Sequence, residues 1–128
     1  MVQPRRLVLI GYWDGPETDH SWPSPEGFVD SGWDLEERDL VASYLRTGLV
    51  ARTYMGYSRC RFCGRNNGDS ELSDGHFVWP DGLSHYVEDH GVRLPDRFVK
   101  HVLKMIDGLE TTQRDERWWR EARPVRRM

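Results

Sequence analysis

The chain has 128 residues, a length typical of one domain that is large enough to bury a core without several crosslinks. Its net charge is only −3, which excludes a global positive field that would hold the protein on DNA or on an anionic membrane. No apolar run reaches the roughly 18 residues that a membrane span needs, and residues 7–10 are too few for the core of a secretory signal. We therefore expect a cytoplasmic protein.

The N-terminal half predicts a strand, a long loop, a helix and a second strand. Residues 6–13 form an apolar run with β-branched side chains, which favours a buried strand. Residues 14–32 are crowded with glycine and proline, and a loop of this length is either a binding loop or an ordered cover. Asp34 is placed to cap a helix, and Glu37 completes a capping-box pattern. Residues 49–57 are predicted to form the second strand.

Aromatic residues are concentrated in and around the long loop. They are Tyr12, Trp13, Trp22, Phe28 and Trp33. If these side chains are exposed, their surface suits a protein partner or a small planar ligand. If they are buried, they hold the loop on the core.

The C-terminal half predicts a hairpin followed by two helices. Residues 71–79 form a short hairpin around an Asp-Gly turn, and Pro80 ends its second strand. Asp81 is placed to cap a helix that runs through His90, and Asp96 begins another helix with one apolar face. These elements predict an α+β fold: a small mixed sheet with a zinc knuckle, a β-hairpin and a histidine-bearing helix, plus two or three further helices.

The pattern with the clearest chemistry is a pair of cysteines followed by a pair of histidines. Cys60 and Cys63 are the only cysteines, and Gly64 relieves the backbone crowding of a knuckle in which both sulfurs face one point. His85 and His90 follow on the predicted helix, at a spacing found in structural Cys2His2 zinc sites. Thiolate and imidazole are borderline-soft donors, and four of them with no water form a closed site. We predict a zinc ion bound by these four side chains.

The spacing of the two histidines sets a geometric condition on this site. Residues five apart on an ideal helix differ by about 140° around its axis, so His85 and His90 converge only if the last turn loosens. Gly91, directly after the helix, permits such loosening. In the alternative, His90 is a core histidine and His76 on the hairpin replaces one of the two ligands. The remaining histidines are expected at the surface: His20 and His101.

The sequence supports a catalytic site less well than a structural metal site. The cysteines come before the histidines and no His-x-Glu precedes a Pro-Cys-x2-Cys, which disfavours a zinc deaminase. The His-Glu-x2-His pair of a metalloprotease is absent. One enzymatic alternative stays open, a metal-dependent nuclease of ββα-metal type with His76 as general base and His85 or His90 as metal ligand. The pattern favours a binding role over catalysis.

The C-terminal segment, residues 111–128, has a separate character from the zinc-containing α+β domain of residues 1–110. Its net charge is +3, so the net charge of residues 1–110 is −6. Arginine pairs with phosphate while indole stacks on bases, so this basic helix or tail is a possible contact for nucleic acid or a protein partner. It can equally fold back on the acidic body. The residues that would make the contact are Arg114, Arg117, Arg120, Trp118 and Trp119.

Residues 60–95 also carry a resemblance. They contain Cys-x2-Cys-Gly, then Asp-Gly-x2-Val-Trp-Pro-x-Gly-Leu-x-His-Tyr-Val, then His-x-Val-Arg-Leu-Pro. This core resembles a set of small, uncharacterised bacterial zinc-binding proteins, and its order of knuckle, hairpin and helix is similar to a treble clef or an enlarged zinc finger. The resemblance implies a compact cytoplasmic zinc module and implies no activity.

Overall fold

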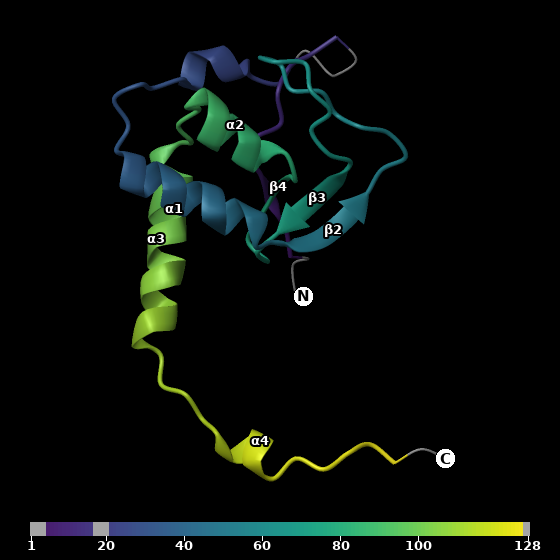
Figure 1. Cartoon of the computed structure of the whole chain (residues 1–128), viewed down its shortest axis with the longest axis vertical. Coiled ribbons are helices and arrows are strands. Elements are labelled where there is room, and N and C mark those ends of the chain that lie inside the picture. The colour runs from purple at the N-terminus through teal and green to yellow at the C-terminus, as the bar shows by residue number, and fades with distance from the viewer. Residues whose placement is uncertain (1–4, 17–20, 127–128) are drawn as a thin grey trace.

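A computed structural model describes residues 5–16 and 21–126 of the chain (Figure 1). Its strands and helices are β1 Val8–Leu9, the 3₁₀ turn η1 Pro25–Phe28, α1 Leu35–Arg46, β2 Leu49–Thr53, β3 Ser70–Ser73, β4 Phe77–Pro80, α2 Leu83–His90, α3 Asp96–Thr111 and α4 Arg117–Arg120. This order confirms the predicted α+β class with a hairpin and a histidine-bearing helix. Among the described residues three further α-helices accompany α2.

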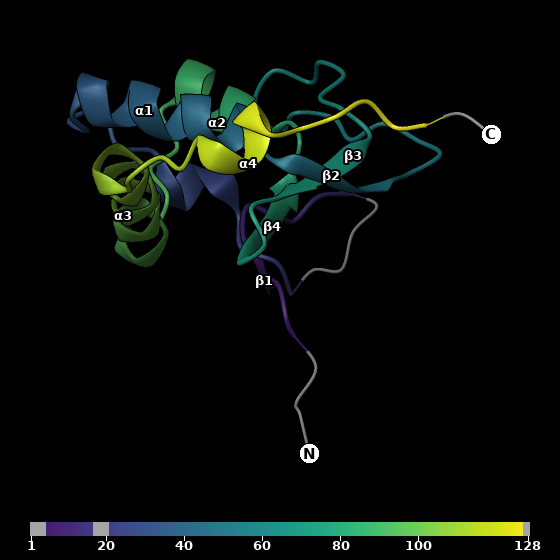
Figure 2. The ribbon, with the colours of Figure 1, turned by 90° about the horizontal axis from the view of Figure 1, so that it is seen from below.

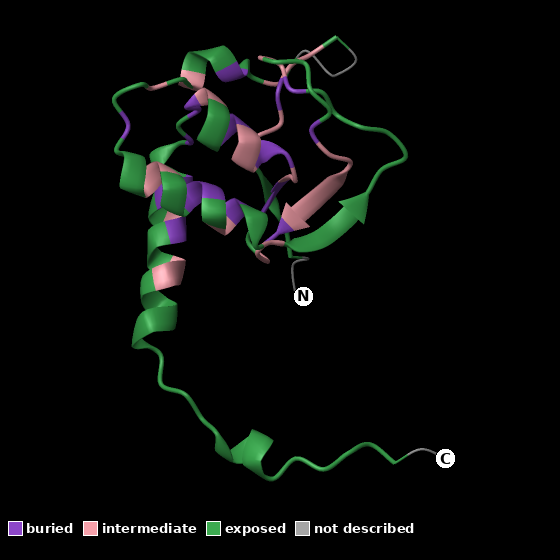
Figure 3. Cartoon of the chain, in the orientation of Figure 1, coloured by how far each residue is buried: buried purple, intermediate pink, exposed green. Residues whose placement is uncertain are grey.

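The strands form one mixed sheet in the order β1-β4-β3-β2, with β1 parallel to β4 and the other neighbours antiparallel. Figures 1 and 2 show α1, α2 and α3 grouped on one side of this sheet. The prediction of a buried strand over residues 6–13 is wrong, because only Val8 and Leu9 pair and both are exposed. They form a short edge strand, and β4 supplies most of the sheet's buried residues instead (Figure 3).

Helix α1 begins where the sequence predicts. Asp34 is its N-cap, and the Asp34 carboxylate accepts a 3.0 Å hydrogen bond from the Glu37 amide. The reciprocal half of the capping box is replaced, because the Glu37 carboxylate accepts from the indole N–H of Trp33 at 3.1 Å. Near the other end, the fully buried Trp79 donates its indole N–H to the Leu45 carbonyl at 3.0 Å, which ties β4 to α1.

The hairpin and the start of α2 fit closely against the knuckle loop. The predicted Asp-Gly turn is present, and Gly75 has a φ of 91°, where glycine is favoured. The prediction that Asp81 caps α2 is wrong, because the N-cap is Gly82 and the Asp81 carboxylate accepts instead from a backbone N–H at Ser70. The Gly82 carbonyl accepts from the buried Asn67 side chain at 3.0 Å, and a Cβ at position 82 would collide with Asn67. Asn67 thus joins the knuckle loop to α2.

The aromatic residues near the N-terminus form an ordered cover over α2. Trp13 is buried, and its ring lies 5.3 Å from that of Phe28 and 5.9 Å from that of Tyr86 on α2. This packing favours the cover over a freely exposed binding loop, although Tyr12 and Trp22 stay half-buried. Residues 17–20, with the predicted surface residue His20, lie outside the described residues.

The second half of helix α3 extends beyond the body that its first half packs on (Figure 1). Its first half buries Phe98, Val99 and Val102, whereas Leu109 is exposed. Residues 112–126 are exposed throughout, and α4 is their one short helix. Figure 1 shows this segment extending away from the body, so the alternative in which it folds back on the acidic domain is not the arrangement found.

Candidate metal centre

The cysteine pair lies in a tight turn between β2 and β3. The Gly64 amide donates to the Cys60 carbonyl at 2.9 Å, and the Cys60 amide donates to the Arg65 carbonyl at 3.0 Å. Gly64 has a φ of 71°, which matches the conformation expected of a glycine after a knuckle. Cys60 is buried, Cys63 is exposed, and both thiols are free. Such a turn directs two thiols toward one point.

The histidine pair lies on α2, and the end of that helix differs from an ideal one. Gly91 has a φ of 65°, and the amides of Gly91 and Val92 both donate to the Tyr86 carbonyl. These bonds reach five and six residues back, where a regular α-helix reaches four. The last turn is therefore widened, which confirms the loosening that the spacing of His85 and His90 requires.

The four predicted ligands come together in space. One donor atom from each of Cys60, Cys63, His85 and His90 lies within 4.8 Å of the other three. The Cys63 Sγ and His85 Nε2 atoms are 3.4 Å apart. Zinc bonds of about 2.0–2.3 Å in a tetrahedron place neighbouring donors roughly 3.3–3.8 Å apart. The observed separation therefore fits two ligands of one ion, and a small contraction brings in the rest.

Asp89 fixes the orientation of His85, and sequence reasoning missed it. The His85 Nδ1 atom lies 2.8 Å from an Asp89 carboxylate oxygen, one helical turn further on. A proton on Nδ1 leaves the Nε2 lone pair facing Cys63, and metal-bound histidines commonly have such a carboxylate partner. The signal was present in the sequence as an acidic residue four positions after a histidine on a predicted helix.

His90 has the burial and the environment of a neutral ligand. Its Nε2 atom is buried and has no hydrogen-bond partner among the described residues. Buried polar atoms are rarely left unpaired, and a metal ion would satisfy this one. Burial, aided by the neighbouring His85, lowers the pKa of His90, which favours the neutral form that binds metals. The Phe62 ring stacks on His90 at 4.7 Å and holds its plane.

Tyr86 links the knuckle to the helix beneath it. Its hydroxyl accepts a 2.8 Å hydrogen bond from the Arg61 amide and also interacts with the Cys60 side chain. Burial raises the pKa of Tyr86, so the hydroxyl keeps its proton and can donate it toward a thiolate. A hydroxyl in this position would stabilise the negative charge of Cys60 if that residue binds a metal as a thiolate.

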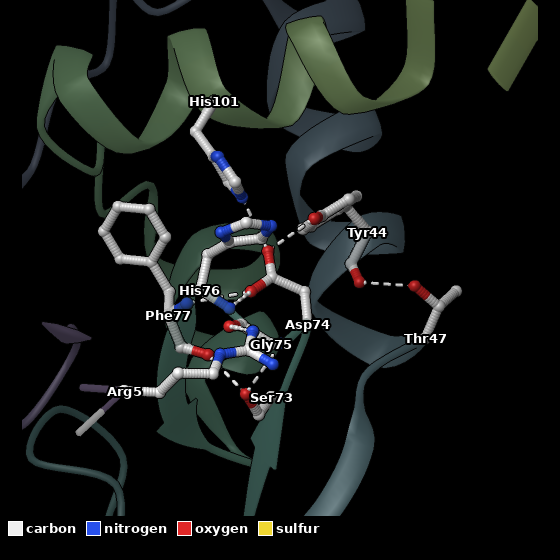
Figure 4. Close-up of polar contacts among 9 residues, drawn as sticks. All are labelled: Arg5, Tyr44, Thr47, Ser73, Asp74, Gly75, His76, Phe77 and His101. Atoms are coloured by element: carbon white, nitrogen blue, oxygen red, sulfur yellow. Dashed lines mark hydrogen bonds and ion pairs between the residues drawn. The ribbon is translucent and has the colours of Figure 1, made fainter. Parts of the chain in front are cut away.

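The other histidines of the described chain lie elsewhere. The prediction that His101 is a surface residue is wrong: its Nε2 atom lies 2.7 Å from an Asp74 carboxylate oxygen, and 18% of its side chain is exposed. The same oxygen accepts a 2.6 Å hydrogen bond from the Tyr44 hydroxyl, and the other accepts from the amides of His76 and Phe77. Figure 4 shows this Asp74 hub, formed by Tyr44, Asp74 and His101, joining α1, the hairpin turn and α3.

The position of His76 bears on two of the alternatives. Its ring is exposed and packs on His101 at 5.2 Å, rather than joining the four clustered ligands. His76 therefore does not replace His85 or His90. A ββα-metal nuclease needs its hairpin histidine beside the metal, and the structure does not bring His76 there.

The tail residues lie apart from the cluster, on exposed backbone. Trp118 and Trp119 are 80% and 74% exposed, with ring centroids 6.3 Å apart. Arg117 pairs with Asp115, and Arg120 pairs with Glu116, both at the surface. The tail thus presents two indoles and several guanidinium groups to solvent.

Comparison with known proteins identifies no relative. No family model matches the chain, and neither a curated protein nor a solved structure matches it. Among the described residues, no helix combines the length and the apolar character that crossing a bilayer requires.

Proposed function

We propose that Cys60, Cys63, His85 and His90 bind one zinc ion as a closed structural site, and that the protein is a binding module and not an enzyme. The observation that carries this proposal is the convergence of four soft protein donors on one point. Four protein ligands fill a zinc tetrahedron and leave no position for a reactive water. The order of knuckle, hairpin and helix supports a treble-clef type of arrangement.

Zinc is the metal that suits this donor set best. Two thiolates and two imidazoles in a tetrahedral arrangement select zinc over magnesium or calcium, which prefer oxygen ligands. We propose a cytoplasmic location, where a reducing environment keeps two neighbouring cysteines available as thiolate ligands. The ion would join the β2–β3 connection to α2, so its binding energy would contribute directly to folding.

Metal analysis of the purified protein tests this site. We expect one zinc per chain, and loss of that zinc in Cys63→Ser and in His90→Ala. His76→Ala is the matched control, since it removes an exposed histidine outside the cluster and should retain the ion. A finding of iron in place of zinc would change the proposed metal but not its ligands. Full zinc content in the Cys63 and His90 variants would refute the site.

For the binding role, we propose single-stranded nucleic acid as the partner of the tail. The exposed rings of Trp118 and Trp119 support this choice, because base stacking on an aromatic side chain contributes about 1–3 kcal/mol per base. The arginines add phosphate contacts, although two of them are partly neutralised by their acidic neighbours. A protein partner is the alternative outcome.

Fluorescence anisotropy with a labelled single-stranded oligonucleotide tests the partner. We expect binding at low salt that weakens as salt rises, with a log–log slope reduced by about 2 when Arg114, Arg117 and Arg120 are all replaced by alanine. Trp118→Ala should weaken binding about tenfold. Lys104→Gln on α3 is the control for loss of a positive charge outside the tail. Absence of binding at low salt would exclude nucleic acid as the partner.

A further inference from the structure

A cleft of about 670 Å³ lies beside the knuckle, between the N-terminal aromatic cover and the segment that connects β2 to β3. Its volume is in the range of small-molecule sites in proteins, about 300–1,000 Å³. Cys60 is one of its lining residues, so the proposed zinc site would hold part of the wall. The described tail residues and the Asp74 hub do not line it.

Aromatic rings from separate parts of the chain line this cleft. Tyr12 and Trp22 come from the N-terminal segment, and their ring centroids are 5.8 Å apart. Tyr54 and Tyr57 come from the connection after β2, and both are exposed. Ring faces that border a cleft attract positively charged groups through their quadrupoles.

The carboxylate of Glu71 adds a fixed negative charge to the same wall. Its side chain is only 13% exposed. The Tyr12 hydroxyl donates to one Glu71 oxygen, and the Tyr54 hydroxyl donates to the other at 2.9 Å. Each carboxylate oxygen has two lone-pair sites, so the two tyrosine hydroxyls neither fill the acceptor capacity of Glu71 nor neutralise its charge. The carboxylate is therefore oriented before any ligand arrives.

One cationic side chain of this protein, that of Arg52, already contacts these groups. The Arg52 guanidinium lies over the Tyr54 ring, 5.9 Å from its centroid, and its Nε atom is 3.8 Å from a Glu71 oxygen. Arg52 is 69% exposed, so little packing holds it in place. The Tyr54 ring and the Glu71 carboxylate thus form a site that fits a planar or compact cation. Arg52 occupies this site weakly.

The remaining charged groups of the cleft do not oppose a cation. Asp69 and Asp81 add two more carboxylates to the wall. The arginines of the wall are engaged by backbone carbonyls: Arg61 donates to Asp14 at 3.0 Å, and Arg59 donates to Gly64 at 3.2 Å. Three carboxylates face the two arginines of the wall and Arg52, so the site is neutral while Arg52 contacts Glu71 and carries a charge of −1 once a ligand displaces Arg52.

We propose that this cleft binds an organic cation, an ammonium or guanidinium group, between the rings of Tyr12, Trp22, Tyr54 and Tyr57 with the Glu71 carboxylate as its counter-charge. This site goes beyond the proposed tail function and does not depend on nucleic acid. It rests on the proposed zinc site only in so far as the ion holds the wall at Cys60. Zinc content is therefore measured on every variant, so that a lost metal site is distinguished from a lost cation site.

Choline and its neutral carbon isostere, 3,3-dimethylbutan-1-ol, form a matched pair of probes. Binding is followed by tryptophan fluorescence of the full, zinc-loaded chain. We expect choline to bind at least tenfold more tightly than the isostere, because only choline carries the charge that the rings and Glu71 recognise. A peptide containing trimethyllysine provides the second arm: tighter binding of the peptide than of choline would identify a protein side chain as the natural source of the cation.

Two substitutions that should weaken choline binding are compared with one that should strengthen it. Glu71→Gln and Tyr57→Ala should each weaken choline binding several-fold, and Tyr57 is exposed, so its loss should leave the fold intact. Arg52→Gln should strengthen choline binding several-fold, because it removes the internal competitor. Trp118→Ala in the tail is the control and should change nothing. Equal binding of both probes, no saturable binding of either, or choline affinity unchanged in Glu71→Gln and Arg52→Gln would overturn the proposal.

Discussion

The Cys/His cluster and the Asp74 hub both join distant parts of the chain, but only one of them is complete by itself. In the hub, donors surround the Asp74 carboxylate, since Tyr44, His101 and two backbone amides all reach its oxygens. In the cluster, His85 already faces Asp89 with one nitrogen, and its other nitrogen faces a sulfur. The buried Nε2 of His90 has no partner in the described chain. A cluster of four metal-binding side chains with one unpartnered buried nitrogen has room for a cation, whereas the hydrogen bonds of the hub are satisfied by protein groups alone.

Removing a metal ligand is expected to have the largest effect. Cys60→Ser should lower the free energy of unfolding by about 4 kcal/mol or more and give a poorly soluble or partly unfolded protein, because the ion contributes to folding. Thermal unfolding followed by circular dichroism, with and without a chelator, measures this loss. Full thermal stability of metal-free Cys60→Ser would mean that the cluster, like the hub, does not need a metal ion for its stability.

Breaking the hub should destabilise the protein without touching the metal. Asp74→Ala leaves Tyr44, His101 and two amides without their acceptor, and we expect a loss of about 2–4 kcal/mol in urea unfolding. Tyr44→Phe removes a single hydrogen bond and should cost about 1 kcal/mol. Zinc content should stay at the wild-type value in both variants. A chelator-dependent effect of Asp74→Ala would contradict the separation of the two regions.

The support of His85 offers a subtler test of the cluster. Asp89→Asn should weaken zinc binding about 10- to 100-fold in competition with a chelator while leaving the zinc-loaded fold intact, because the amide holds the imidazole less well than the carboxylate. Glu88→Gln is the matched control on the same helix, since Glu88 pairs with Arg46 instead. Equal zinc affinity of the two variants would mean that Asp89 has no role in the site.

The pH dependence of the hub is expected to be smaller than the effect of removing Asp74. Burial would raise the pKa of Asp74, but hydrogen bonds from Tyr44, the Phe77 and His76 amides and His101 outweigh it and lower the pKa to about 2 from its usual 3.8. A carboxyl with a lowered pKa stabilises the fold above its unfolded-state pKa and loses that contribution as pH falls toward 2.

We expect about 1–2 kcal/mol of stability to disappear between about pH 5 and pH 2 through this group. The difference in urea unfolding between wild type and Asp74→Asn, measured at each pH, isolates it from acid release of the metal. The advantage of wild type should shrink steadily as pH falls. A difference that is constant with pH would mean that Asp74 does not titrate in this range.

The two regions also differ in how far the sequence predicts them. The grouping of Cys60, Cys63, His85 and His90 was predictable because few residue types bind zinc and the spacings of such ligands are constrained by local geometry. The pairing of Asp74 with His101 was not, because it joins a hairpin turn to a helix 27 residues later through tertiary packing alone. The spacing of residues along the sequence indicates a knuckle and a helix. It does not indicate which turn will pack against a given helix.

Errors in the fold prediction have the same origin. Residues 6–13 have the composition of a buried strand, yet β1 lies at the edge of the sheet, where Val8 and Leu9 are exposed. Asp81 has the right type and position for an N-cap, yet its carboxylate is drawn to the backbone at Ser70. The Asp34 cap was predicted correctly because its partner, Glu37, is three residues away. In these three cases, the prediction whose partner lies within one turn was right, and the two decided by packing between elements were wrong.

X-ray absorption at the zinc edge of the purified protein tests the central claim most directly. We predict a first coordination shell of two sulfur atoms at about 2.3 Å and two nitrogen atoms at about 2.0–2.1 Å, with imidazole scattering beyond them. A shell with fewer protein donors and a bound oxygen would mean an open site and return catalysis to consideration. Absence of sulfur from the shell would contradict the account altogether.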